Sequence, residues 1–539
     1  MQIGRNISEG EAVAELLVQL PKLLARGQSP RSALERLLAL GDVRAVPYLI
    51  GLLAASEQPI RRSAAQTIDG LMAQTNASLL RFEPMVRGSM FSPGLGEPSD
   101  IWRLRQVSEH DARLIIAEGP PVAVLGLLSM VADGRVREVA TSALAAQRGG
   151  NEISYLLLRV NDWVPQVSQI ATNGLLSRVN RQCAPDLARG LALVESLGSK
   201  RRVNNTHLVH SVWSLLTETD EGLAALRGIF FEGDRETRRA AARLVSVRSP
   251  ALALRFSESL SDSDPVVRTQ LIGAALHGGN AEQLAEWVPK FLTDRMVRVR
   301  SMAFTAASAR CPEVLLPRLK ALLFDQNVWL REFARQAIPK AGEQDFASIY
   351  SAVILAEGPA LLSAIAGIGE TGNETHGVLV QPHVVKGSSK MRQTALRALC
   401  QLLGQKADLT VVAALGSELA GVSKVALELI RTARLTFVAD DIVPLCRSEH
   451  AHVRTNALRA LVKVGRWEAL IAGLEAYADP NIGVTVAAAE ILARWHSVPI
   501  DLYRGPSEAQ RSRLRAAITV APLALRAVSS TVNSILGST

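Results

Sequence analysis

Aromatic residues are scarce in this chain of 539 residues. Phenylalanine, tryptophan and tyrosine make up 4% of the sequence, although hydrophobic residues make up 48%. A chain of this length exceeds what one compact core usually supports, and a single thick core needs bulky side chains to fill it. The composition therefore favours many thin contacts between helices rich in alanine and leucine.

Cysteine is also rare, and no Cys-x-x-Cys pair occurs among Cys183, Cys311, Cys400 and Cys446. Each cysteine lies in or beside an apolar helical run, so we interpret all four as reduced packing residues. The first residues lack the charged-then-apolar order of a signal peptide, and no run of about 18 apolar residues is present. We therefore expect a cytoplasmic protein.

Recognisable catalytic and cofactor motifs are missing. Gly367–Gly372 matches the Gly-x-Gly-x-x-Gly pattern, but it follows the helical run Leu361–Ala366 instead of a strand, so its glycines are predicted to form a helix C-cap and the next turn. His207 and His210 share a helical face without a third metal ligand. We predict no catalytic residue, no cofactor and no metal site.

Positive charge is present in excess but is unevenly distributed. The net charge of +9 arises from 60 basic and 51 acidic residues. The segment 503–539 holds five arginines and one glutamate, a net of +4, which leaves +5 for the rest of the chain. Because binding to nucleic acid depends on clustered cations that neutralise phosphates, this distribution argues against a nucleic-acid surface along the main part of the chain.

A short phrase recurs along the sequence: an acidic or turn residue, two or three spacers, a branched apolar marker and often an arginine. Asp264-Pro265-Val266-Val267-Arg268 is the clearest copy. With the apolar residue as the marker, successive copies lie about 31 residues apart. The markers are Ile60, Val136, Val167, Thr237, Val267, Val299, Leu330, Met391, Val425, Val453 and Ile482, with degenerate copies near Leu361 and Val203.

Each marker is predicted to open a helix whose apolar positions recur at i, i+4 and i+7 or i+8. The i+4 position is alanine in eight copies, which lets a second helix lie close: Ala64, Ala140, Ala171, Ala241, Ala303, Ala334, Ala395 and Ala457. No helical pair can bury this stripe alone, so stability must come from stacking. We predict an all-α fold, a right-handed α-solenoid of about fourteen helical pairs.

The period and the Asp-Pro-x-Val-Arg phrase resemble the HEAT repeat, and in particular the short bacterial HEAT-like class shared with phycobilisome lyase proteins. The resemblance covers about residues 30–495. It implies that the Asp and Arg of the phrase pair between successive turns as a ladder, formed by Arg137, Arg268, Arg300, Arg331, Arg392 and Arg454. It also implies that the second helix of each pair lines a concave face. Arginines that point away from the apolar stripe are our candidates for partner contact on that face: Arg62, Arg239, Arg243, Arg335, Arg397 and Arg459.

Two segments interrupt the period. The segment 82–102 mixes glycine and proline with bulky apolar residues, among them Met90, Phe91 and Leu95, and either binds a partner or packs on the array. Gly369–Ser389 is predicted to contain a shortened first helix.

The chain is divided into an N-terminal capping helix (1–29), the repeat array (30–496), and a linker with a basic amphipathic C-terminal helix (497–539). That last helix either caps the array or docks on a partner or a membrane surface.

These features favour a non-enzymatic scaffold or adaptor whose partner is another protein. A nucleic-acid binder that uses the concave-face arginines is the alternative. A bilin lyase and a DNA glycosylase are two further activities found on HEAT-like folds, but no residue here can be assigned to either chemistry.

Overall fold

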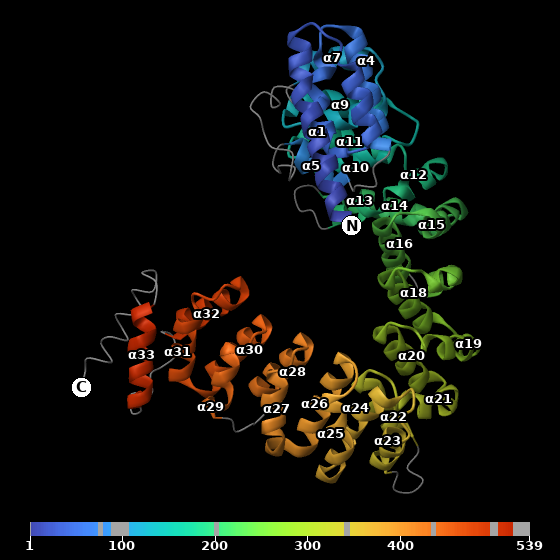
Figure 1. The fold of residues 1–539 in the computed structure, drawn as a ribbon. Coiled ribbons are helices and arrows are strands. Elements are labelled where there is room, and N and C mark those ends of the chain that lie inside the picture. The colour runs from blue at the N-terminus through green and yellow to red at the C-terminus, as the bar shows by residue number, and fades with distance from the viewer. Residues whose placement is uncertain are drawn as a thin grey trace. The chain divides into compact units, whose positions relative to one another are not determined.

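The computed structural model describes residues 2–73, 79–87, 107–198, 204–248, 250–338, 345–432, 438–495 and 505–520. Every regular element in these ranges is an α-helix or a short 3-10 helix, which confirms the predicted all-α class. The helices form two compact units, residues 1–306 and 307–539, which are described separately. Both are built from successive helical pairs (Figure 1).

The first unit contains the helices α1 Gln2–Ala25, α2 Arg31–Leu40, α3 Val46–Leu49, α4 Gln58–Ala73, α5 Leu79–Val86, α7 Glu109–Ala117, α8 Val122–Leu128, α9 Gly134–Ala146, α10 Ile153–Arg159, α11 Pro165–Leu176, α12 Ala184–Arg189, α13 Leu191–Gly198, α14 Thr206–Glu218, α15 Asp220–Glu232, α16 Arg235–Arg248, α17 Pro250–Leu254, α18 Pro265–Gly278, α19 Ala281–Phe291 and the start of α20 Val297–Arg310. The second contains α21 Leu316–Leu322, α22 Val328–Ala337, α23 Phe346–Leu355, α24 Leu361–Thr371, α25 Gly377–Val385, α26 Ser389–Leu403, α27 Asp408–Leu415, α28 Ala420–Thr432, α29 Ala439–Ile442, α30 Ala451–Val464, α31 Arg466–Ala476, α32 Ile482–Trp495 and α33 Glu508–Val520. Short 3-10 turns, such as η8 Gly404–Ala407 and η9 Val443–Arg447, lead into or extend several first helices.

The second helix of each regular pair begins two residues before its marker. This holds for α4, α9, α11, α16, α18, α20, α22, α26, α28, α30 and α32. The start is fixed by a polar residue three positions before the marker, which accepts hydrogen bonds from the first helical amides. Asp133, Asp264, Asn327 and Ser388 act in this way.

Two of the predicted markers are wrong. In α28 the residue at the marker position is Val422, which is 2% exposed, and in α32 it is Val484, which is fully buried, whereas Ile482 is 81% exposed. The error arose because β-branched residues recur within three positions in both helices, and a period of about 31 residues was applied too loosely to choose between them. With the corrected positions, Met391, Val422, Val453 and Val484 are equally spaced along the chain.

The stacking of the second helices depends on the small residue at i+4. The alanine at this position is fully buried in all eight predicted copies. In the second unit α24, α26, α28, α30 and α32 lie side by side in chain order, each contacting the next, while first helices such as α25 and α27 pack on one side of this row (Figure 1). The predicted solenoid of stacked pairs is therefore present within this unit.

The predicted shortened helix within Gly369–Ser389 is wrong. Helix α24 continues through the glycines to Thr371, and α25, Gly377–Val385, is a full first helix that includes Pro382. The glycines do not end α24. They lie within the helix, because neighbouring residues leave no room there for a larger side chain. The irregularity lies instead at the start of α24, which begins at the marker Leu361 after a turn where Glu357 has φ +47°.

One stretch, Ser389–Leu415, meets the length and hydropathy criteria for a helix that could cross a membrane. It is not a single helix, because it consists of α26, η8 and α27, with Gly404 at φ +55° between the two α-helices. Its first helix also carries Lys390, Arg392 and Arg397. We therefore assign the stretch to the second helix of one repeat and the first helix of the next.

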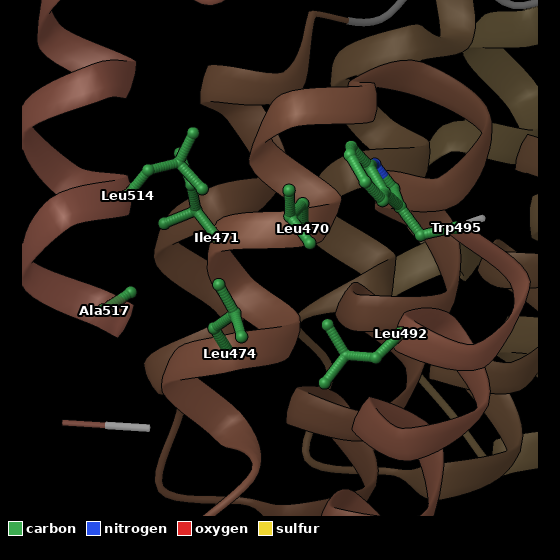
Figure 2. Close-up of a cluster of buried hydrophobic side chains, with 7 residues drawn as sticks. All are labelled: Leu470, Ile471, Leu474, Leu492, Trp495, Leu514 and Ala517. Carbon is green, nitrogen blue, oxygen red and sulfur yellow. The ribbon is translucent and has the colours of Figure 1, made fainter. Parts of the chain in front are cut away.

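Helix α33 packs against α31 at the end of the second unit. Leu514 is fully buried beside Ile471, and Ala517 lies over Leu474 in a cluster that also includes Leu470, Leu492 and Trp495 (Figure 2). Gln510 of α33 donates a hydrogen bond to Glu468 of α31. The helix thus covers apolar surface of the last pair, while residues 521–539 lie outside the described ranges.

Candidate interaction surface

The arginine that follows the marker links its own repeat to the next one. Arg454 donates from Nη1 to the carbonyls of Ser448 and Glu449, at 2.9 and 3.0 Å, and from Nε and Nη2 to both oxygens of Asp479, at 2.8 and 2.9 Å. Arg137 makes the same set of bonds, to two carbonyls that follow α8 and to Asp162. Each of these arginines thus satisfies carbonyls that a helix end leaves free and also binds a carboxylate of the following repeat.

The predicted ladder is confirmed for three arginines, and its acidic partner is now defined. Arg137, Arg268 and Arg454 each bind an aspartate of the next repeat, namely Asp162, Asp294 and Asp479. These aspartates lie five residues before the next marker, whereas the phrase residue Asp264, three before it, caps its helix. Arg331 departs from the pattern, because it binds Glu370 near the end of α24 instead.

Two positions of the ladder carry serine in place of arginine. Ser168 donates to the carbonyl of Val160 at 2.6 Å, and Ser423 donates to that of Leu415 at 2.7 Å. The amide of Asn456 in the following repeat donates to Ser423 Oγ at 3.0 Å. At Ser423 a neutral hydrogen-bond chain therefore replaces the ion pair, and the contact with the next repeat is kept.

Five of the six arginines predicted to contact a partner form ion pairs within the chain. Arg239 binds Asp264 at 2.9 Å and Arg243 binds Glu195. Arg335 is 8% exposed in its side chain and binds Glu332, Glu370 and the hydroxyl of Tyr350. Arg397 binds Glu428 at 2.8 Å, and Arg459 binds Glu490 at 3.4 Å. The sequence did not indicate these pairings, because the carboxylates lie up to 48 residues away.

Arg62 and the apolar candidates differ from these five. Arg62 is exposed on α4, and its charge helps to keep the pKa of Glu118 low, after the larger effect of the hydrogen bond from Arg61. Met90, Phe91 and Leu95 lie outside the described residues. The start of their segment is described, and there Phe82 and Val86 of α5 are 1% and 6% exposed. The first turns of segment 82–102 therefore pack on the array.

A cluster of buried charges joins α5 to the repeat stack and was missed by the sequence analysis. Glu83 of α5 binds Arg159, whose side chain is 1% exposed, and also Arg87. Arg159 binds Asp162 at 2.8 Å, so this carboxylate is shared with the ladder arginine Arg137. Burial lowers the pKa of Arg159, opposed by the nearby carboxylates. No spacing in the sequence links Glu83 to a residue 76 positions away.

The Gly-x-Gly-x-x-Gly segment is a close-packing site. A Cβ atom at Gly367 would lie 2.4 Å from the ring of Tyr350, and one at Gly369 would lie 2.7 Å from Cα of Ala398 in α26. Only Gly372 is at the C-cap, so the prediction of a cap and turn holds for the last glycine alone. The first two glycines let α23 and α26 approach α24.

Two tryptophans lie on the surface. Trp163 is 62% exposed and its ring lies 5.5 Å from the guanidinium carbon of Arg137; Trp329 is 65% exposed and tilts against Phe333. By contrast, Trp467 and Trp495 pack against each other in the apolar cluster beside α33. Within the described ranges, no group of three or more His, Cys, Asp or Glu residues is placed to hold a metal.

Comparison with known proteins gives only distant structural likenesses. No family model and no curated protein match the chain by sequence. Its fold is similar to Kap95p in complex with RanGDP (TM-score 0.35, 10% identity, 88% of this chain and 63% of that one) and to Kap121p (0.31, 13%, 94% and 64%). It is also similar to the S. pombe condensin Cnd3–Cnd2 subcomplex (0.31, 12%, 97% and 80%). The chain thus spans less than two thirds of the two karyopherin chains, and no partner is transferred from likenesses this distant.

Proposed function

We propose that the chain is a non-enzymatic, protein-binding scaffold or adaptor of the HEAT-like type. The observation that carries this proposal is the pairing of Arg239, Arg243, Arg335, Arg397 and Arg459 with carboxylates of the chain itself. Each of these pairs places a carboxylate beside the arginine, and that carboxylate repels a phosphate backbone, whereas affinity for nucleic acid comes from the phosphates that are neutralised. A face on which positive and negative charges lie side by side suits a protein partner better.

The exposed tryptophans add a second argument. Tryptophan is enriched among the residues that carry binding energy in protein interfaces. Trp163 and Trp329 each expose more than three fifths of their surface at the start of a second helix. We propose that they contact partner protein, together with Arg62 and the apolar residues Met90, Phe91 and Leu95.

The test combines two measurements on the purified chain. In an electrophoretic mobility titration with duplex DNA, a scaffold shows no binding near physiological salt, while a nucleic-acid binder shows affinity that falls steeply as salt rises. An affinity pull-down from the native cell extract, with mass spectrometry, then identifies protein partners. Steep salt-dependent DNA binding without any protein capture would contradict the scaffold function and favour the nucleic-acid alternative.

Residues 90, 91 and 95 need their own variants. Replacing Met90, Phe91 and Leu95 by serine should weaken capture of the partner and leave the melting temperature unchanged if these side chains bind it. A serine variant at a buried position of the same segment, Phe82→Ser, should lower the melting temperature instead. A destabilised triple variant that still captures its partner would assign residues 90–95 to packing.

A further inference from the structure

Helix α28 presents one narrow face that no other described helix covers. Helices α26 and α30 pack on its two sides and α27 packs beneath it, and these contacts bury Val422, Val425, Ala426 and Ile430. The remaining face carries Lys424, Glu428 and Arg431, all exposed and spaced as successive turns of one stripe. Glu428 is therefore the centre of a surface formed by three adjacent second helices.

Arg397 and Lys424 act directly on this carboxylate, and two further cations lie on the same helix or at the equivalent position of the next one. Arg397 of α26 binds it at 2.8 Å from one side, and Arg459 occupies the equivalent position of the next repeat, on α30. Lys424 lies one turn before it and Arg431 one turn after it on α28 itself. Hydrogen bonding to Arg397, with the charges of Arg397 and Lys424, lowers the pKa of Glu428, so the carboxylate is ionised and the five residues carry a net charge of +3.

Basic and acidic residues are also separated between the second helices and the segments that connect them. Helices α26, α28 and α30 hold eight basic residues and one acidic residue, while the connecting segments and first helices at 404–419, 438–450 and 465–481 hold three basic and eight acidic residues. At the position of Glu428, successive repeats alternate in sign, from Arg397 through Glu428 and Arg459 to Glu490. An extended ligand that crosses α26, α28 and α30 therefore meets cation, anion and cation in turn.

Stability does not explain this arrangement. The side chains of Arg397, Glu428, Arg459 and Glu490 are 36% to 53% exposed, and exposed ion pairs contribute little to folding. Within the part of the chain that the structure describes, the side chains of Lys424 and Arg431 make no hydrogen bond or ion pair. Two unpaired cations beside two weak ion pairs form a surface that can still bind a charged ligand.

We propose that the exposed face of α26, α28 and α30 around Glu428 docks an extended acidic segment of a protein partner, which deepens the proposed scaffold function and rests on it. Packed helices lie about 8–10 Å apart, so Arg397 and Arg459 are about 16–20 Å apart. An extended chain that rises about 3.1 Å per residue covers this distance in about six residues. The partner segment then has acidic residues at its first and seventh positions and a basic residue at its fourth, opposite Glu428.

A continuous polyanion fits this face less well. The central carboxylate and that of Glu490 repel a phosphate backbone, whose charges have one sign throughout, but they attract the basic residue of a peptide with alternating charge. The same carboxylates give the face a charge order, which provides a specificity that net charge alone does not.

The experiment uses the full chain and two labelled peptides of identical composition. The matched peptide is Glu-Pro-Pro-Lys-Pro-Pro-Glu, which is preordered as a polyproline helix, and the control is Lys-Pro-Pro-Glu-Pro-Pro-Glu. Fluorescence anisotropy at low salt should show binding of the matched peptide several-fold tighter than that of the control. Equal affinities, or no binding of either peptide, would overturn the proposal.

Two variants make the test specific. Glu428→Lys should abolish the preference, so that the matched peptide no longer binds more tightly than the control. Glu374→Lys changes the same charge at an exposed glutamate that pairs with Lys406 away from this face, and it should leave the preference unchanged. If both variants behave alike, with melting temperatures equal to that of the wild type, the assignment to this face is wrong.

Two further arms separate this proposal from its alternatives. A single-stranded oligonucleotide that binds more tightly than either peptide, and loses affinity in the variant Lys424→Gln/Arg431→Gln, would assign the face to nucleic acid and overturn the proposal. In the pull-down, a protein partner that the same double variant still captures at full strength would also overturn the docking face, while the scaffold function would stand.

Discussion

Arg137 and Asp162 come from successive repeats and form an ion pair at 2.9 Å in which both side chains are fully buried. Removing one partner from such a pair leaves an uncompensated buried charge, which costs more than the intact pair contributes. The same carboxylate also binds Arg159 at 2.8 Å and accepts a hydrogen bond from the amide of Val164 at 3.0 Å. A change of charge at Asp162 should therefore destabilise the first unit.

Acidification should destabilise the first unit through Asp162. Burial alone would raise the pKa of this carboxyl, but the hydrogen bonds from Arg137 and Val164 and the charges of Arg159 and Arg137 bring the pKa below its usual range. A lowered folded-state pKa contributes stability that is present above the unfolded pKa and lost as the pH falls through the folded value. Urea unfolding followed by circular dichroism should therefore show a loss of stability below about pH 4.

The variant Asp162→Asn provides the control for this pH dependence. At pH 7 it should cost about 3–5 kcal/mol, because Arg137 and Arg159 lose their shared anion. The difference between wild type and variant should shrink as the pH falls, since protonation removes the same charge in the wild type. A difference that stays constant from pH 7 to pH 3 would mean that Asp162 acts through packing and not through its charge.

Arg268→Ala should lower stability by about 1–3 kcal/mol and leave partner binding intact. Arg268 is 5% exposed, donates to the carbonyl of Asp262 at 2.6 Å and binds Asp294. Thermal melting measures the cost, and Arg62→Ala on exposed α4 is the control that should change the melting temperature little. Lost partner capture with unchanged melting would show that Arg268 belongs to the binding surface.

Gly369→Ala should destabilise the second unit, because the added methyl group would lie 2.7 Å from the backbone of Ala398. Overpacking of this kind costs about 1–3 kcal/mol. Gly358→Ala is the matched control, since its Cβ would meet nothing within 4 Å. Melting temperatures of the two variants should differ by several degrees, and equal values would contradict the close contact between α24 and α26.

Cys400 and Cys446 should react slowly with a thiol reagent at pH 8 in the folded protein. Burial raises the pKa of Cys400 to about 11 and that of Cys446 to about 12, so little of either thiol is present as the reactive thiolate. Mass spectrometry of iodoacetamide-treated protein measures the modification at each site. Unfolding in guanidinium should make both sites react at the rate of a free cysteine, and rapid modification of the folded chain would contradict their burial.

The repeat was predictable from the sequence because its chemistry is local. A cap residue, a marker and an alanine four positions on lie within one helical start, and the alanines are buried where the period predicts them. The ladder was available only through resemblance to a family, since a pairing between one repeat and the next requires that the stack be known. The correct marker Val484 is separated from Ile482 by burial, whereas Val422 and Val425 are both buried and only the start of α28 at Ala420 separates them.

The surface was predicted less completely than the fold. Helical spacing correctly placed Arg397 and Arg459 on exposed faces, but their partners Glu428 and Glu490 lie one whole repeat away. Arg335 was predicted to be exposed, yet Glu370 of α24 and the hydroxyl of Tyr350 in α23 bind it. The period of the sequence predicts the direction in which a side chain points. Its ion-pair partner depends on how neighbouring helices are offset along their axes.

The sequence separation between ladder arginine and aspartate is nearly constant, at 25 residues for Arg137 with Asp162 and for Arg454 with Asp479 and 26 residues for Arg268 with Asp294, and this has a consequence for how such a chain can change its length. Each arginine reaches only the repeat that follows, so a rung depends on local register and not on position in the chain. Gene duplication or deletion of whole repeats would give every arginine a new neighbour in the same place. A deletion of part of a repeat would separate a buried arginine such as Arg137 from its carboxylate, so the gain or loss of whole repeats should disturb the array least.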